Sequence, residues 1–164
     1  MIRAFLILIS LMSCATWSTF AISNPIPTGS VSALPNTNQV SLSWAAPAPV
    51  SGVSVSSYKI EYRQLSLTNS NAVFTEWPVR PATGQVSISG LNTGSIYEFK
   101  ITPIDSTGDG PSYLLTLSTL LPQPVNLIIS QNDNSVGISW DSPTSGGSPI
   151  TDYIIEYRIA GSNG

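Results

Sequence analysis

The sequence contains no histidine, and Cys14 is its only cysteine. Without an imidazole, neither a Ser-His-Asp triad nor a histidine metal site can form. The acidic residues are scattered along the chain. Asp105 and Asp109 lie in one loop, but two carboxylates fall short of the six to eight oxygens that calcium prefers. The sequence therefore predicts no catalytic residue, no metal site and no cofactor, and we expect the chain not to be an enzyme.

Charge is also scarce, since Asp, Glu, Lys and Arg together make up 9% of the residues. Arg3 is the only basic residue among the first 58, and without it five basic residues remain against nine acidic ones. Phosphate backbones and anionic lipids attract a basic face, which this composition does not supply. We therefore expect no nucleic-acid partner.

The N-terminal segment has the pattern of a secretory signal peptide. Arg3 is followed by the apolar run Ala4–Met12 and then by small residues, so we expect a leader over residues 1–21, cleaved after Ala21. Two alternatives remain open: lipidation at Cys14 after a lipobox-like Leu-Met-Ser, or an uncleaved anchor over Ala4–Ile22. Each reading predicts a secreted or cell-surface protein, with membrane attachment only in the two alternatives.

Several short segments alternate between apolar and polar residues with a period of two. Tyr58–Arg63 alternates three apolar with three charged side chains, and Val40–Trp44 alternates apolar residues with serines. This alternation is typical of antiparallel strands with one buried face. Segments rich in Gly, Pro, Asn and Ser separate the strands, which predicts a β-sandwich. The predicted strands are Thr28–Leu34, Val40–Trp44, Tyr58–Arg63, a strand marked by Phe74 and Trp77, Gln85–Ser89, Ile96–Thr102 and Ser112–Ser118.

An internal repeat organises the chain. Ser41–Trp44 (SLSW) recurs 96 residues later as Gly137–Trp140 (GISW), and Tyr58–Arg63 (YKIEYR) recurs 95 residues later as Tyr153–Arg158 (YIIEYR). Two matched segments in the same order at nearly the same spacing indicate two copies of one domain. By this spacing the second copy stops after its third strand, so we expect a fragment of a longer protein.

The chain resembles the fibronectin type III family. The resemblance rests on Trp44–Pro47, on Leu91–Tyr97 and on Gly108–Ser112, and the second copy matches the family pattern in Gly146–Tyr153. It implies an all-β, immunoglobulin-like antiparallel sandwich in tandem, with one domain over residues 25–120 and a truncated second over 121–164. The core residues expected on this basis are Trp44, Tyr58, Tyr62, Leu91, Tyr97, Trp140, Tyr153 and Tyr157.

The resemblance also implies a tyrosine corner. In this arrangement Tyr97 donates its hydroxyl to a backbone carbonyl between Leu91 and Ser95. The third strand of the first copy is expected to pair with the strand that carries Tyr97. The register that sets Arg63 opposite Glu98 also sets Glu61 opposite Lys100, and opposed charges of opposite sign favour it over registers that oppose like charges.

The expected function is contact with an extracellular protein or surface partner, which the sequence does not identify. We expect a non-catalytic adhesion, receptor or spacer module built from tandem repeats. The alternative is an accessory segment of a secreted enzyme, such as one that degrades carbohydrates, with a catalytic domain beyond Gly164. The short link Leu120–Pro124 contains two prolines, which predicts a stiff joint and an elongated tandem rod.

Overall fold

The computed structural model describes residues 24–66, 72–147 and 149–158. This part of the chain forms antiparallel β-structure and contains no helix. The expected leader, together with Cys14, lies outside the described residues. The strands are β1 (Ser32–Pro35), β2 (Gln39–Ser43), β3 (Ser57–Leu65), β4 (Thr75–Glu76), β5 (Gln85–Ser89), β6 (Ile96–Asp105), β7 (Gly108–Asp109), β8 (Tyr113–Ser118), β9 (Val125–Asn132) and β10 (Ser135–Asp141).

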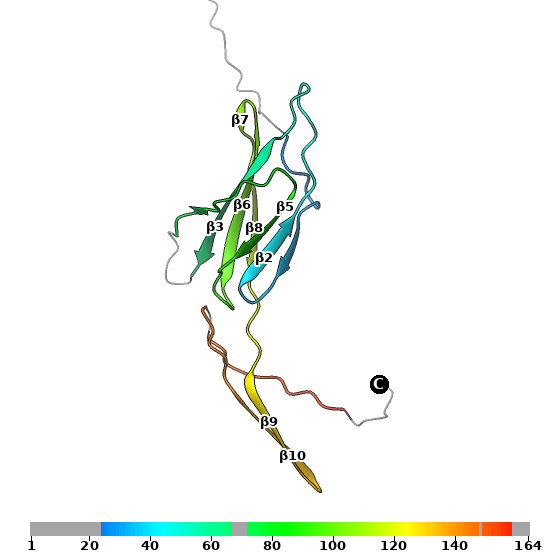
Figure 1. Ribbon diagram of the computed structural model, residues 1–164, viewed down its shortest axis with the longest axis vertical. Coiled ribbons are helices and arrows are strands. Elements are labelled where there is room, and N and C mark those ends of the chain that lie inside the picture. Colours follow the sequence, from blue (N-terminus) through cyan, green and yellow to red (C-terminus); the bar gives the residue numbers. More distant parts are fainter. Residues whose placement is uncertain (1–23, 67–71, 148, 159–164) are drawn as a thin grey trace, which may run out of the picture.

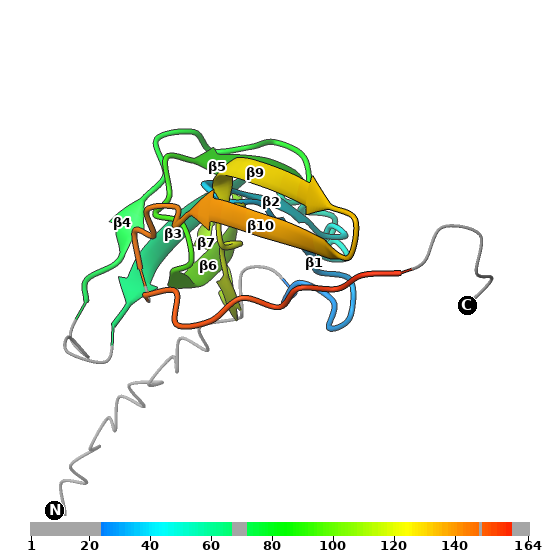
Figure 2. The ribbon, with the colours of Figure 1, turned by 90° about the horizontal axis from the view of Figure 1, so that it is seen from below.

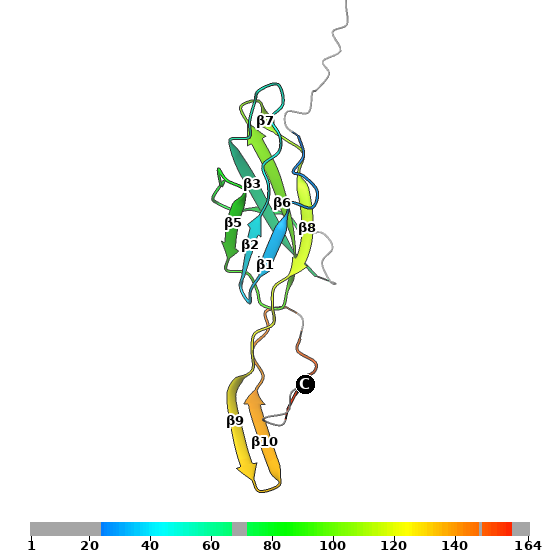
Figure 3. The same ribbon diagram turned by 90° about the vertical axis from the view of Figure 1, so that its right-hand side faces the viewer.

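The first eight strands make a two-layer sandwich. One layer has the order β1–β2–β5, and the other has the order β4–β3–β6–β7, with β8 also paired to β6. Figures 1 and 3 show the two layers face to face, with β9 and β10 continuing beyond one end of them along the long axis. The fold class predicted from the sequence is confirmed.

The core lies between the two layers. It is made of inward-facing residues that alternate along the strands, as a half-buried antiparallel sheet requires. All of them are 6% exposed or less: Ile26, Val40, Leu42, Trp44, Tyr58, Ile60, Ile88, Leu91, Tyr97, Phe99 and Ile101. Fully burying one large apolar side chain contributes about 1.5–3 kcal/mol, so these residues can stabilise the sandwich without a disulfide.

The strand β6 is longer than the sequence predicted. Its residues from Pro103 to Asp105 continue the ladder beyond Thr102, because β3 extends alongside them and β7 folds back onto them. The short strand β4 forms between Phe74 and Trp77, as their spacing indicated.

The register between β3 and β6 agrees with the prediction from charge. Arg63 lies opposite Glu98, and Glu61 lies opposite Lys100. Both pairs form ion pairs, with the Arg63 Nη2 to Glu98 Oε2 distance 2.6 Å and the Lys100 Nζ to Glu61 Oε2 distance 2.7 Å.

The second repeat forms the hairpin β9–β10, with a register shift between Ser139 and Asp141. The expected strand over Tyr153–Arg158 is not formed, and Tyr157 is 93% exposed rather than part of a core. In the first repeat the matching strand β3 is held by β4 and β6. Residues 149–158 have no such partners among the described residues, and an unpaired segment has no ladder to stabilise it.

Among the described residues, none belongs to a helix long and apolar enough to span a bilayer.

Candidate functional site

The acidic loop between β6 and β7 is built as a turn. Asp105 Oδ1 accepts hydrogen bonds from the Thr107 amide at 2.8 Å and from the Thr107 hydroxyl at 2.6 Å. The hydroxyl contributes most to holding the pKa of Asp105 below its usual range, and the amides of Thr107 and Gly108 add to it. Asp109 forms an ion pair with Lys59 on β3. The described residues contain no group of three or more potential metal ligands, and the two carboxylates serve the turn and the ion pair.

The outer face of β3 and β6 carries a ladder of ion pairs covered by one aromatic ring. The side chains of Glu61 and Glu98 are only 18% and 19% exposed. Phe74 lies over this ladder, with its ring centroid 4.5 Å from Arg63 Cζ and 4.9 Å from Lys100 Nζ. Arg63 also donates to the Ala72 carbonyl at 3.0 Å. Phe74 therefore packs on the outside of the sheet through cation–π contacts, and the charges of this face are satisfied within the domain.

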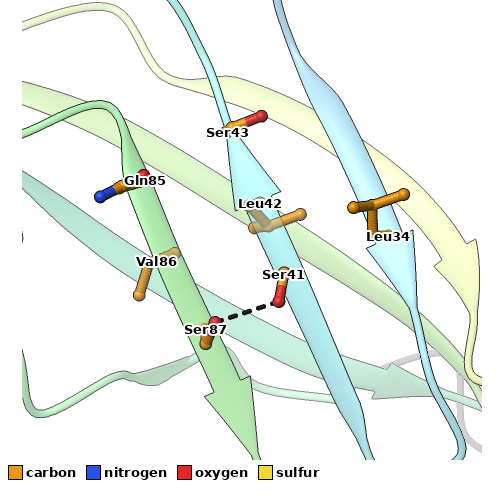
Figure 4. A pocket seen from close by; sticks show the side chains of 7 residues that line it. All are labelled: Leu34, Ser41, Leu42, Ser43, Gln85, Val86 and Ser87. Carbon is orange, nitrogen blue, oxygen red and sulfur yellow. Dashed lines mark hydrogen bonds between the residues drawn. The ribbon is translucent and has the colours of Figure 1, made fainter.

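The opposite sheet presents a face without charges. Its outward side chains on β1, β2 and β5 are serines, glutamines and the exposed Leu34. A shallow hollow of about 440 Å³ on this face is lined by Leu34, Ser41, Leu42, Ser43, Gln85, Val86 and Ser87. Figure 4 shows this hollow and the hydrogen bond across it, in which the Ser41 and Ser87 hydroxyl oxygens lie 3.0 Å apart. Because these hydroxyls bond to each other and the hollow is wide open, it lacks the convergent polar groups of a small-molecule site.

The corner before β6 is centred on Tyr97. Its hydroxyl accepts a hydrogen bond from the Asn92 amide at 2.9 Å and lies 3.4 Å from Gln64 Oε1, to which it can donate. The expected bond was the reverse, with the hydroxyl donating to a backbone carbonyl. That expectation is wrong in direction, because the Asn92 N–H points to the Tyr97 hydroxyl, while the Asn92 carbonyl points to Thr119 and accepts from its hydroxyl at 2.6 Å. Burial raises the pKa of Tyr97, and the Asn92 amide opposes part of this rise.

The aromatic residues expected in the core divide by repeat. Trp44, Tyr58, Leu91 and Tyr97 are buried between the layers, and the rings of Trp44 and Tyr58 meet edge to face at 5.0 Å. Tyr62 is half-buried and stacks on Phe99 at 6.4 Å.

In the second repeat, Trp140 and Tyr153 are also half-buried. Their rings meet edge to face at 5.1 Å. This contact reproduces that of Trp44 with Tyr58 at matching positions of the repeat. Tyr157 was also expected in the core, and that prediction is wrong because its side chain is almost fully exposed.

The pole of the sandwich opposite the second repeat is formed by two preformed loops. Residues 44–56 join β2 to β3, and residues 105–112 contain the turn at Asp105 (Figure 1). In the first loop Val50 and Val53 exchange backbone hydrogen bonds of 3.1 and 2.9 Å. Ser56 ties the first loop to the end of β6, because its hydroxyl donates to the Ile104 carbonyl at 3.0 Å, next to the turn at Asp105. We call these two loops the free pole.

Sequence reasoning missed the role of Phe74 over the ion pairs. The only indication in the sequence was that Phe74 lies beside a strand and between two polar segments. A core residue can have the same position, so this indication does not distinguish the two. Cross-strand charge pairs could be predicted because antiparallel geometry links them to residue numbers. The position of the Phe74 ring cannot be predicted in this way, because Phe74 lies in a connecting segment and not in a paired strand.

A family model for the fibronectin type III domain matches residues 25–116 and 122–163. Mouse protein sidekick-2 is 31% identical over 130 residues, which cover 74% of this chain and 6% of that protein. The human cell adhesion molecule DSCAM is 26% identical over 131 residues, which cover 76% of this chain and 6% of that protein. This chain thus spans less than a tenth of the length of these relatives.

Solved structures agree on the fold. A segment of two fibronectin type III domains from chicken tenascin superposes with a TM-score of 0.51 at 19% identity, covering 70% of this chain and 62% of that one. The domain from human collagen alpha-1(XX) gives a TM-score of 0.51 at 17% identity, covering 65% of this chain and 94% of that one.

Proposed function

Since this chain belongs to the fibronectin type III family, we propose that it is a non-catalytic module that mediates contact with a protein partner outside the cell or at its surface. The observation that carries the proposal is the free pole. It is a preformed surface at one end of the sandwich, while the other end leads into the second repeat.

Three properties support a contact at this pole. Its loops are held by their own hydrogen bonds, so binding loses little conformational entropy. Pro47 is buried beneath the first loop, whereas Pro49, Ser51 and Ser106 are exposed. The outer faces of the two sheets offer fewer groups for a partner to bind. The charges on the face of β3 and β6 are paired with each other, and the serines in the hollow on β2 and β5 are hydrogen-bonded to each other. A human relative is itself named a cell adhesion molecule.

The proposal is tested by binding to intact cells of the organism that encodes the chain. We expect a fluorescent tetramer of the purified chain to bind saturably, and protease treatment of the cells to abolish that binding. In parallel, we expect no co-sedimentation with insoluble cellulose or chitin. Retention on a polysaccharide without protease-sensitive binding to cells would contradict the proposal and favour an accessory segment of a carbohydrate-degrading enzyme.

Two matched substitutions locate the contact. Ser106→Arg places a cation at the free pole, and Ser89→Arg places the same charge on the exposed face of β5. We expect Ser106→Arg to weaken cell binding by about tenfold or more, as at a central interface position, while Ser89→Arg leaves it unchanged. The reverse pattern would assign the contact to the sheet.

A further inference from the structure

The loop before β6 lies against the second repeat. Residues 92–95, which we call the corner loop, face the segment 145–147 of the second repeat. The Gly146 amide donates to the Thr93 hydroxyl at 2.9 Å across this contact. Figure 1 shows β9 and β10 beyond this end of the sandwich, and in Figure 2, which is seen from that end, they lie in front of it. From this contact we infer that the corner loop is a docking surface for the 145–147 segment, and that it sets the orientation of one repeat relative to the next.

The fit depends on two adjacent glycines. A Cβ at Gly146 would lie 3.0 Å from Asn92 Cβ and 3.2 Å from the Thr93 nitrogen. A Cβ at Gly147 would overlap the Gly94 carbonyl oxygen and Ser95 Oγ. Neither glycine has a left-handed φ, so its own backbone would accept alanine. The neighbouring repeat excludes a side chain at Gly147 and leaves little room for one at Gly146.

Hydrogen bonds to Thr119 and Leu120 hold the corner loop in the conformation that contacts the second repeat. The buried Thr119 hydroxyl donates to the Asn92 carbonyl at 2.6 Å and accepts from the Ser95 amide at 2.9 Å. The Thr119 amide donates to the Ser95 carbonyl at 2.9 Å, and the Gly94 amide donates to the Leu120 carbonyl at 3.1 Å. The start of the inter-repeat link is therefore bonded to the same loop that receives the second repeat.

The link also closes around Gly94, whose φ is +57°. A Cβ there would lie 2.6 Å from Leu121 Cδ2 and 3.0 Å from Ser145 Oγ, so it would meet both the link and the docking segment. Orientation thus depends on a three-part contact of corner loop, link and docking segment, and not on the stiffness of the prolines alone.

The first repeat does not carry the docking segment. Between Trp44 and Tyr58 it has the single glycine Gly52, whereas the matching loop of the second repeat has the adjacent pair Gly146 and Gly147. At least one of the two positions therefore carries a side chain in the first repeat, which excludes the same close backbone approach. The free pole therefore presents a different surface from the one that docks on the corner loop.

The inference is tested by a distance distribution between two spin labels. The labels are attached through Ser89→Cys on β5 and Ser135→Cys at the tip of the hairpin, in the full chain carrying Cys14→Ser. We expect a narrow distribution that becomes at least twice as broad in Gly147→Ala. The matched control is Thr144→Ala, at an exposed neighbouring position, and it should keep the original width.

A second variant acts from the other side of the contact. Thr93→Val removes the acceptor of the Gly146 amide without altering the hairpin, so that amide should exchange with solvent about three- to tenfold faster, as expected for one lost hydrogen bond. It should also broaden the distance distribution. An already broad distribution in the parent chain, or unchanged widths in both Gly147→Ala and Thr93→Val, would overturn the inference.

Discussion

Replacing Tyr97 with phenylalanine removes one hydroxyl from the tyrosine corner and leaves the ring in place. In the structure this hydroxyl accepts a hydrogen bond from the Asn92 amide at 2.9 Å, and Tyr97 is 4% exposed. Without it the Asn92 N–H loses its acceptor, while the Asn92 carbonyl remains bonded to Thr119. The loss therefore falls on one backbone donor at the edge of the core.

The expected cost follows from that stranded donor. A buried group left without its partner costs about 1–3 kcal/mol. Asn92 is itself exposed, so water can reach part of the site, and we expect the lower half of that range, about 1–2 kcal/mol. For a domain of this size each kcal/mol lowers the Tm by about 4–8 °C, which makes the effect easy to measure.

The assay is urea unfolding of residues 24–121 followed by far-UV circular dichroism, with Tyr62→Phe as the matched control. Tyr62 is half-buried and contacts the same aromatic cluster, with ring centroids 6.3 Å from Tyr97, but no hydrogen bond of its hydroxyl is present among the described residues. Its loss should change the free energy of unfolding by less than about 0.5 kcal/mol. Equal effects of the two substitutions would refute the assignment of the Tyr97 hydroxyl as a structural acceptor.

Two further predictions concern the core and its titrating groups. Trp44→Ala should destabilise residues 24–121 by about 3–5 kcal/mol, as for other large buried aromatics, and the half-buried Trp77 should cost less when truncated. Comparable losses in urea unfolding would contradict the burial of Trp44. Burial raises the pKa of Tyr58, and the Asp109 carboxylate raises that of Lys59. Both groups hold their protons more tightly in the folded state. Their contribution to the free energy of unfolding should therefore be fully present below about pH 10 and be lost as the pH rises further. The lowered pKa of Asp105 acts in the opposite sense and costs stability as the pH falls below about 4. Denaturant midpoints measured from pH 2 to 11 should show both declines. A midpoint that stays constant above pH 10 would contradict the prediction for Tyr58 and Lys59.

The sequence alone was enough to predict a β-sandwich and the register of one pair of its strands. Alternation with a period of two assigns each side chain to a face, so the positions of Ile60 and Phe99 in the core follow from their neighbours in the chain. The resemblance implied that the strands of Arg63 and Glu98 are neighbours, and charges of opposite sign then favoured the register that sets these two residues opposite each other. The alternation is a local property of the sequence, and the segments that match Ser41–Trp44 and Tyr58–Arg63 repeat it 96 and 95 residues later.

Only the tertiary structure decided how loops distant in sequence meet. It reversed the expected hydrogen bond of Tyr97, placed Phe74 over the ion pairs and left Tyr157 exposed. It also brought Gly146 against Thr93, which lies 53 residues earlier in the chain. No periodicity encodes such contacts, because they depend on where whole loops end once the sheets have packed. A glycine pair in the sequence indicates only a turn, and its use as a contact between repeats becomes visible when the neighbouring backbone occupies the space of a side chain.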